Sequence, residues 1–92
     1  MTKEEKEKEK RSKREFTADQ IKKAKLEMKT RVKGSRWEVK DKQHNWEKGM
    51  VVDVEKYMKG RTLKAAFFKV TFDEWSDEFD EHVPAHDGKR FR

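Results

Sequence analysis

The sequence predicts a mainly β domain, a small twisted sheet closed into a barrel, preceded by a basic amphipathic helix. Two observations lead to this fold class. Residues 35–92 contain at least three short runs in which apolar and polar residues alternate. Residues 17–34 instead show apolar residues at helical spacing. Short strands so close together with little else between them typically form a barrel, because a closed sheet leaves no free edges.

The positive charge is confined to the first third of the chain. The 92 residues carry 25 Lys and Arg against 19 Asp and Glu, a net charge of +6. Residues 1–34 hold 13 basic and 7 acidic side chains, whereas residues 35–92 hold 12 of each. A basic arm on a neutral domain predicts that the arm contacts a polyanion.

The composition also excludes several classes of protein. Without cysteine the chain has no disulfide framework and no thiolate zinc site. The first residues have no apolar core typical of a signal peptide, and no apolar run is long enough to cross a membrane, so we expect a soluble intracellular protein with no membrane partner. The run KRSKR at residues 10–14 is compatible with nuclear import.

The N-terminal third divides into a tail and a helix. Residues 1–16 are rich in Lys and Glu, which predicts a disordered tail or a solvated, frayed helix. In residues 17–34, Thr17 can cap a helix over about residues 18–33, with Gln20 completing a capping box and Gly34 ending it. The predicted apolar face comprises Ala18, Ile21, Met28 and Val32. The candidate nucleic-acid contacts on the other face are Lys22, Lys23, Lys29 and Arg31.

Three strands are predicted from alternation in residues 35–92. The first, residues 36–41, places Trp37 and Val39 on one face. The second, residues 49–57, has an expected apolar face of Met50, Val52 and Val54. The third, residues 62–72, has an apolar face of Phe68, Val70 and Phe72.

The run FKVTFDEWSDEFDEHVP at residues 68–84 is ambiguous by spacing alone. Phe72, Trp75 and Phe79 recur at intervals of three and four, which fits a helix or a bent strand pair. Phe72 ends a strand of period two, and alternation restarts at Phe79. The context therefore favours a strand, a bend and a short strand that Pro84 ends.

Two segments carry a family resemblance: GSRWEVKDKQHNWEKGMVVDV (34–54) and FFKVTFDEWSDEFDEHVP (67–84). Together they resemble the Royal superfamily of barrel readers, the chromo barrel most closely, with Tudor and MBT modules as further members. Trp46 opens the second strand, and Phe72, Trp75 and Phe79 match the pattern aromatic-x-x-Trp-x-x-x-aromatic. Asp80-Glu81 and Val83-Pro84 follow as in the family. Glu74 stands where the family has Gly, and His82, expected to replace a packing residue, stands where it has a closing aromatic.

The resemblance implies a fold and a function for residues 35–92. The fold would be a five-stranded, SH3-like barrel. The function would be binding of methylated lysine on a histone tail, within a chromatin-modifying complex. The cage would consist of Trp46, Phe72, Trp75 and Phe79. As a second-rank candidate, Asp41 would accept a hydrogen bond from a lower-methylated lysine, although its residue type and position favour a turn.

Physical chemistry supports such a cage independently of the resemblance. A methylated ammonium keeps its charge but hydrates poorly, so it is attracted to aromatic faces. Six carboxylates between residues 73 and 81 would attract a basic peptide and repel a phosphate backbone. They are Asp73, Glu74, Asp77, Glu78, Asp80 and Glu81.

Two other functions stay open. The interleaved Trp and Lys of residues 36–49, with the basic arm, are compatible with a barrel that binds RNA or DNA, nucleosomal DNA included. Alternatively the cage is degenerate, and the helix docks on a partner subunit as part of a scaffold. We expect no enzyme, because no serine has a recognisable base nearby and the chain has no cysteine nucleophile. We expect no cofactor, and the Gly-containing turns show no phosphate-loop pattern. We also expect no metal site, because Pro84 prevents the helix that would bring His82 and His86 together.

Overall fold

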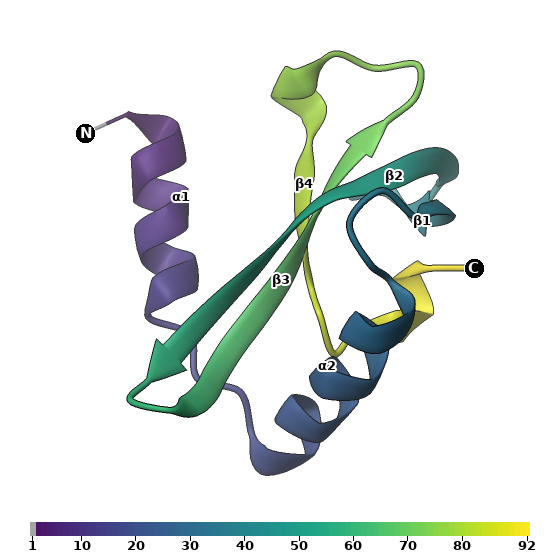
Figure 1. Ribbon diagram of the computed structural model, residues 1–92. Coiled ribbons are helices and arrows are strands. Elements are labelled where there is room, and N and C mark those ends of the chain that lie inside the picture. Colours follow the sequence, from purple (N-terminus) through teal and green to yellow (C-terminus); the bar gives the residue numbers. More distant parts are fainter. Residues whose placement is uncertain (1) are drawn as a thin grey trace.

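One antiparallel sheet in the order β1-β2-β3-β4 organises the computed structural model, which describes residues 2–92 (Figure 1). Its strands are β1 (Arg36–Lys40), β2 (Trp46–Lys59), β3 (Thr62–Phe72) and β4 (Glu81–Pro84). Two helices precede the sheet, α1 (Lys3–Ser12) and α2 (Ala18–Thr30). Two short 3-10 turns follow β3 and β4, η1 (Asp77–Phe79) and η2 (Gly88–Arg90). The expected mainly β fold with a helix before it is therefore confirmed.

The five strands and the closed barrel are not confirmed, because the sheet has four strands and is open. After β4 the chain turns through η2, which leaves only the last two residues extended beside β1. There Val39 and Phe91 form a single bridge. The backbones of Glu38 and Arg92 exchange two hydrogen bonds of 3.0 and 2.9 Å. The free edge of β1 is thus covered by two residues instead of a fifth strand.

The β2–β3 hairpin matches the predicted strands but not every predicted face. β3 spans the predicted residues 62–72, and Gly60, with φ of 62°, lies in the tight turn before it. In β2, Val51 is fully buried although Met50, Val52 and Val54 were the expected face. The register shifts between Val51 and Asp53, which is a β-bulge. The extra residue changes which positions face the core, so Val51 and Val54 both pack inward.

Both faces of β3 are buried. Phe68 and Val70 are inaccessible to solvent together with Val39 and Val51. Neighbouring Phe67 points to the opposite face because successive strand residues alternate. There it packs edge-on against Phe16, which precedes α2, at a ring-centroid distance of 5.7 Å.

Helix α2 begins and packs largely as its sequence predicts. Thr17 and Gln20 form the expected capping box. Ile21 and Met28 pack against the core, and Ala24 between them is fully buried. Ala18 and Val32 were also expected on this face but are exposed. The helix ends at Thr30, and Val32 lies beyond it.

Arg31 joins the end of α2 to β1 and to the C-terminal segment beside it. Its guanidinium lies 4.8 Å from the ring centroid of Trp37 and 4.5 Å from that of Phe91. It also pairs with Glu27 one turn earlier on the helix. Its side chain is only 11% exposed, and burial lowers the pKa of Arg31. Arg31 therefore packs inside the domain and does not lie on the open face of the helix.

Helix α1 forms where a tail or a solvated helix was expected, and none of its residues is buried. It is tied to the sheet by its last turn. Arg11 pairs with Glu55 at 3.0 Å, and the Lys64 ammonium donates a hydrogen bond to the Ser12 carbonyl. Glu55 also lies 3.0 Å from His82 and accepts a hydrogen bond from Tyr57. His82 is thus part of a polar cluster beneath α1.

We expect stability to fall as the pH drops below about 6.5. Burial lowers the pKa of His82, as Arg11 does to a lesser extent, and Glu55 only partly opposes this. Burial also lowers the pKa of His86. The unfolded chain consequently binds more protons at acid pH, and stability is lost as the pH falls from the unfolded pKa through the folded one. Urea unfolding between pH 7.5 and 5 measures this slope.

The combined variant His82→Asn with His86→Asn should flatten that slope. His44→Asn is the matched control, because His44 is exposed and its φ of 66° suits asparagine. A control slope as flat as that of the double variant would contradict the assignment.

Phe91→Ala should destabilise the domain by about 3 to 5 kcal/mol, the usual cost of emptying a buried phenylalanine site. Phe91 is 6% exposed and supports Arg31, Val39 and Phe68. Phe79→Ala is the matched substitution at a ring that is 49% exposed, and it should cost about 1 kcal/mol or less. Urea titration followed by far-ultraviolet circular dichroism compares the two, and equal losses would contradict the packing described.

Candidate functional site

Three aromatic rings from the end of β3 and the loop after it form one continuous group. The ring centroids of Phe72 and Trp75 are 5.8 Å apart, and those of Trp75 and Phe79 are 5.3 Å apart with the planes at 86°. Phe72 is buried at the base, whereas Trp75 is 38% and Phe79 is 49% exposed. We call these three residues the aromatic group. Its outer two rings face solvent from an otherwise polar loop.

Backbone hydrogen bonds bend the loop and bring the rings together. The Asp73 amide donates to the Lys48 carbonyl at 3.0 Å, which extends the β2–β3 ladder one residue past β3. The Trp75 amide then donates to the Phe72 carbonyl, closing a tight turn. Phe79 lies in η1, so the expectation that a strand begins there is wrong and β4 begins at Glu81.

A hollow of about 290 Å³ lies beside the aromatic group. It is lined by Trp46, Glu47, Lys48, Phe72, Asp73, Glu74 and Trp75. Nearby, Gly49 lets β2 and β3 approach closely, because a Cβ there would lie 2.8 Å from the Thr71 carbonyl oxygen. The hollow is at the small end of the range of ligand pockets and therefore suits a side-chain group better than a larger molecule.

Trp46 lines this hollow but makes a different contact from the other predicted cage residues. Its ring carries the guanidinium of Arg92 at 4.1 Å from the centroid. Among the ring pairs within residues 2–92, none joins Trp46 to the aromatic group. The structure thus brings three predicted cage rings into contact and places the fourth at the edge of the same hollow.

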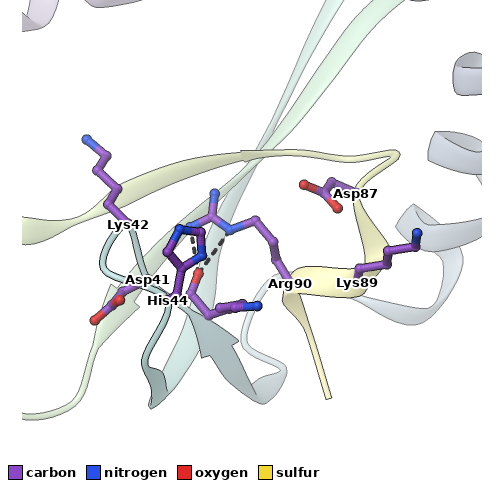
Figure 2. A pocket seen from close by; sticks show the side chains of 7 residues that line it. Asp41, Lys42, His44, Asp87, Lys89 and Arg90 are labelled. Atoms are coloured by element: carbon purple, nitrogen blue, oxygen red, sulfur yellow. Dashed lines mark hydrogen bonds between the residues drawn. The ribbon is translucent and has the colours of Figure 1, made fainter.

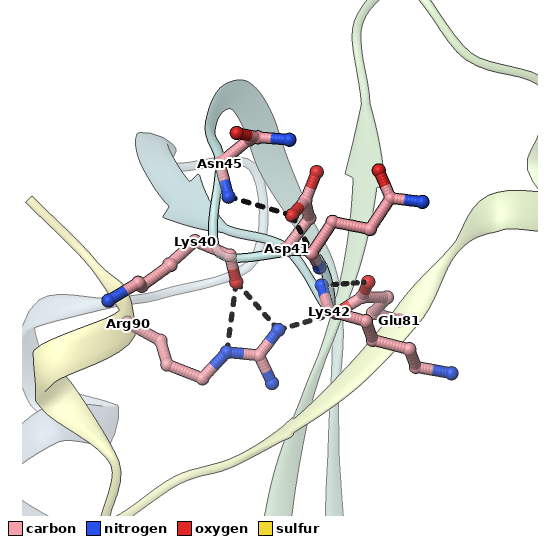
Figure 3. Close-up of polar contacts among 7 residues, drawn as sticks. Lys40, Asp41, Lys42, Asn45, Glu81 and Arg90 are labelled. Carbon is pink, nitrogen blue, oxygen red and sulfur yellow. Dashed lines mark hydrogen bonds and ion pairs between the residues drawn. The ribbon is translucent and has the colours of Figure 1, made fainter.

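Asp41 lies in a neighbouring hollow of about 370 Å³ (Figure 2). In that view the β1–β2 loop residues Asp41, Lys42 and His44 lie on one side, and Asp87 and Lys89 lie on the other. Asp41 is 5% exposed, and its Oδ1 accepts the amides of Gln43 and Asn45 at 2.8 and 2.9 Å (Figure 3). Asp41 is therefore a turn residue, and it is not among those lining the aromatic hollow.

The six carboxylates of the acidic loop divide into engaged and free groups. Glu81 is buried and pairs with Arg90 at 2.5 Å (Figure 3). Asp73 pairs with Arg36. Asp80 is partly buried, and its Oδ1 has no hydrogen-bond partner among the described residues. Glu74, Asp77 and Glu78 are exposed, and within residues 2–92 no ion pair joins them to a basic side chain. These three supply the negative charge around the exposed rings.

The outer face of α2 is more basic than the candidate contacts alone suggest. Lys22, Lys23 and Lys29 are exposed as expected. Lys25, which was not among the candidates, is also exposed and lies on one stripe with Lys22 and Lys29 at spacings of three and four. The spacing was visible in the sequence and could have identified Lys25, whereas nothing local showed that Arg31 turns inward.

Over residues 2–92, no group of three or more His, Asp or Glu side chains is arranged to hold a metal ion. No helix within the same span has the length and apolar character needed to cross a membrane.

Comparisons with known proteins identify no relative. No protein-family model matches the chain, and neither the curated proteins nor the solved structures contain a significant match to it. The function must therefore be inferred from the geometry and from the residues.

Proposed function

We propose that the protein is a chromatin reader that binds a methylated lysine of a basic peptide, such as a histone tail, at the aromatic group and its hollow. The observation that carries the proposal is the pair Trp75 and Phe79, two exposed rings in contact above buried Phe72. Large aromatic residues are seldom left open in a polar loop without a partner. Trp46 lines the hollow with Phe72 and Trp75, and Phe79 adjoins it through its contact with Trp75.

The chemistry of the rings suits a methylated ammonium. Each desolvated ring contributes roughly 0.5 to 2 kcal/mol to binding a cation. The guanidinium over Trp46 supports this, since one of these rings already attracts a cation of the chain itself. Three or four rings give weak binding, about millimolar or somewhat tighter, which flanking contacts of the peptide would strengthen.

The free carboxylates favour a basic peptide over a phosphate backbone at this end of the domain. Glu74, Asp77 and Glu78 would raise the local concentration of a lysine-rich segment. Asp41 has one carboxylate oxygen, Oδ2, without a hydrogen-bond donor among residues 2–92, but that oxygen is buried and Asp41 lines the other hollow. We therefore propose Asp41 as a hydrogen-bond acceptor only as an accessory to the rings.

We also propose that the sheet is a reduced form of the five-stranded, SH3-like barrel of the Royal superfamily. The antiparallel order β1-β2-β3-β4 supports this. The bridge of Phe91 to Val39 lies at the edge of β1 where a fifth strand would pair, and a 3-10 turn leads into it.

A second candidate function is binding of nucleosomal DNA or RNA by the lysine stripe on α2. Three exposed ammonium groups on one helix face, Lys22, Lys25 and Lys29, would follow a phosphate backbone. Both functions can coexist in a nuclear subunit of a chromatin-modifying complex, because the acidic loop and the stripe belong to different elements.

Trp75→Ala should weaken binding of a trimethyllysine peptide about threefold to thirtyfold, because it removes one ring from the cage. NMR titration of the labelled protein, with the methylated peptide and its unmodified twin, measures this. Met58→Ala is the matched control, since Met58 is also exposed but lies at the other end of the hairpin. Equal affinity for both peptides, or an unchanged affinity in Trp75→Ala, would contradict the proposal.

Replacing Lys22, Lys25 and Lys29 together by Gln should weaken binding of a short DNA duplex and flatten its salt dependence by up to about three units of logarithmic slope. The control replaces Lys6, Lys8 and Lys10 of α1 by Gln, an equal loss of charge on the other helix. Fluorescence anisotropy over a range of salt concentrations compares the two sets. Equal losses would show that net charge, and no particular helix face, attracts the duplex.

A further inference from the structure

Arg92 is fixed more firmly than an exposed arginine usually is. Its backbone amide donates to the Glu38 carbonyl at 2.9 Å, and its carbonyl accepts the Glu38 amide at 3.0 Å. Its side chain then pairs with the Glu38 carboxylate through Nε at 2.9 Å. Three contacts to one residue of β1 thus set the position from which the guanidinium reaches Trp46.

The guanidinium stacks on Trp46 from outside the hollow. It lies 4.1 Å from the Trp46 ring centroid. Trp46 lines the aromatic hollow, whereas Arg92 does not and borders a separate depression with Trp37 and Lys48. The guanidinium therefore contacts the Trp46 ring without lining the hollow, whereas Trp46 lines it together with Phe72 and Trp75.

Within the described part of the chain, no ring–ring contact fixes the Trp46 indole, which is partly buried. It is the first residue of β2, paired with Lys40 at the end of β1, and no other aromatic ring within residues 2–92 packs against it. A ring at the end of a strand can occupy several rotamers. Fixing one rotamer before the ligand arrives favours binding, because less side-chain entropy is then lost on association. A planar guanidinium held by a carboxylate is well suited to fix an indole, because it stacks on aromatic faces.

We infer that Arg92 is a positioning residue, which with Glu38 holds the Trp46 indole at the edge of the hollow as a preformed wall. This rests on the proposed binding of a methylated lysine. A cation within the hollow would compete with the ligand, but a cation behind the ring supports the wall without taking the place of the ligand. Removing Arg92 should therefore weaken peptide binding if Arg92 supports the wall, and strengthen it if Arg92 competes with the ligand.

The experiment uses the 92-residue chain with Arg92→Ala, Arg92→Lys and Glu38→Gln. Arg61→Ala is the charge-matched control, because Arg61 is exposed in the β2–β3 turn at the other end of the hairpin. Two quantities are measured: the indole N–H signal of Trp46 without ligand, and the affinity for a trimethyllysine peptide and its unmodified twin. Thermal unfolding of each variant verifies that the fold persists.

Arg92→Ala should shift and broaden the Trp46 indole signal and weaken binding of the methylated peptide about threefold to tenfold. Arg92→Lys should retain part of the affinity, because the ammonium keeps the charge but not the planar stack. Glu38→Gln should give a smaller effect of the same sign, and Arg61→Ala should change neither quantity.

An unchanged indole signal in Arg92→Ala, or tighter binding by it, would overturn the inference. A wild-type protein that does not distinguish the two peptides would refute the proposed function instead. In that case the indole signal alone decides whether Arg92 holds Trp46, so the two failures remain distinct.

Discussion

The guanidinium of Arg31, held between Trp37 and Phe91, is the contact on which the rest of the domain depends. It links the end of α2 to the first strand and to the C-terminal residues, which the Glu38–Arg92 backbone hydrogen bonds hold beside that strand. Phe91 continues the chain of contacts to Phe68 in the core, at a ring-centroid distance of 5.5 Å. A buried charge needs a partner, and Glu27 supplies it from the same helix. The helix is consequently part of the core and not an appendage to the sheet.

Features that depend on nearby residues could be predicted from the sequence, and those that depend on distant residues could not. The capping box of α2 and the bounds of β3 follow from patterns a few residues long. The inward turn of Arg31 depends on Phe91, sixty positions away in the chain, so its place among lysines suggested a surface role. The bulge after Val51 likewise follows from pairing with β3, and it moved the buried face away from Met50 and Val52.

The candidate site shows the same division. The spacing of Phe72, Trp75 and Phe79 identified three rings that are in contact, because a tight turn brings together residues three and four apart. It could not place Trp46, whose surroundings are set by Arg92, or assign Asp41 to its turn. The acidic loop also holds less free charge than its composition suggests, because Asp73 and Glu81 are engaged by Arg36 and Arg90. A local sequence pattern thus identifies candidate residues for the site. Pairing with residues distant in the chain decides which of them remain available to a ligand.

The position of Phe91 affects how the domain can form during synthesis. Residues 1–84 supply both helices and all four strands, yet β1 keeps a bare edge and Arg31 lacks its second ring until residues 91 and 92 arrive. A nascent chain on the ribosome would therefore expose an unpaired strand edge and an incomplete core until this segment leaves the exit tunnel. The fold formed before residues 91 and 92 emerge would be less stable than the complete domain. Chaperones would have their best opportunity to bind the chain during this interval.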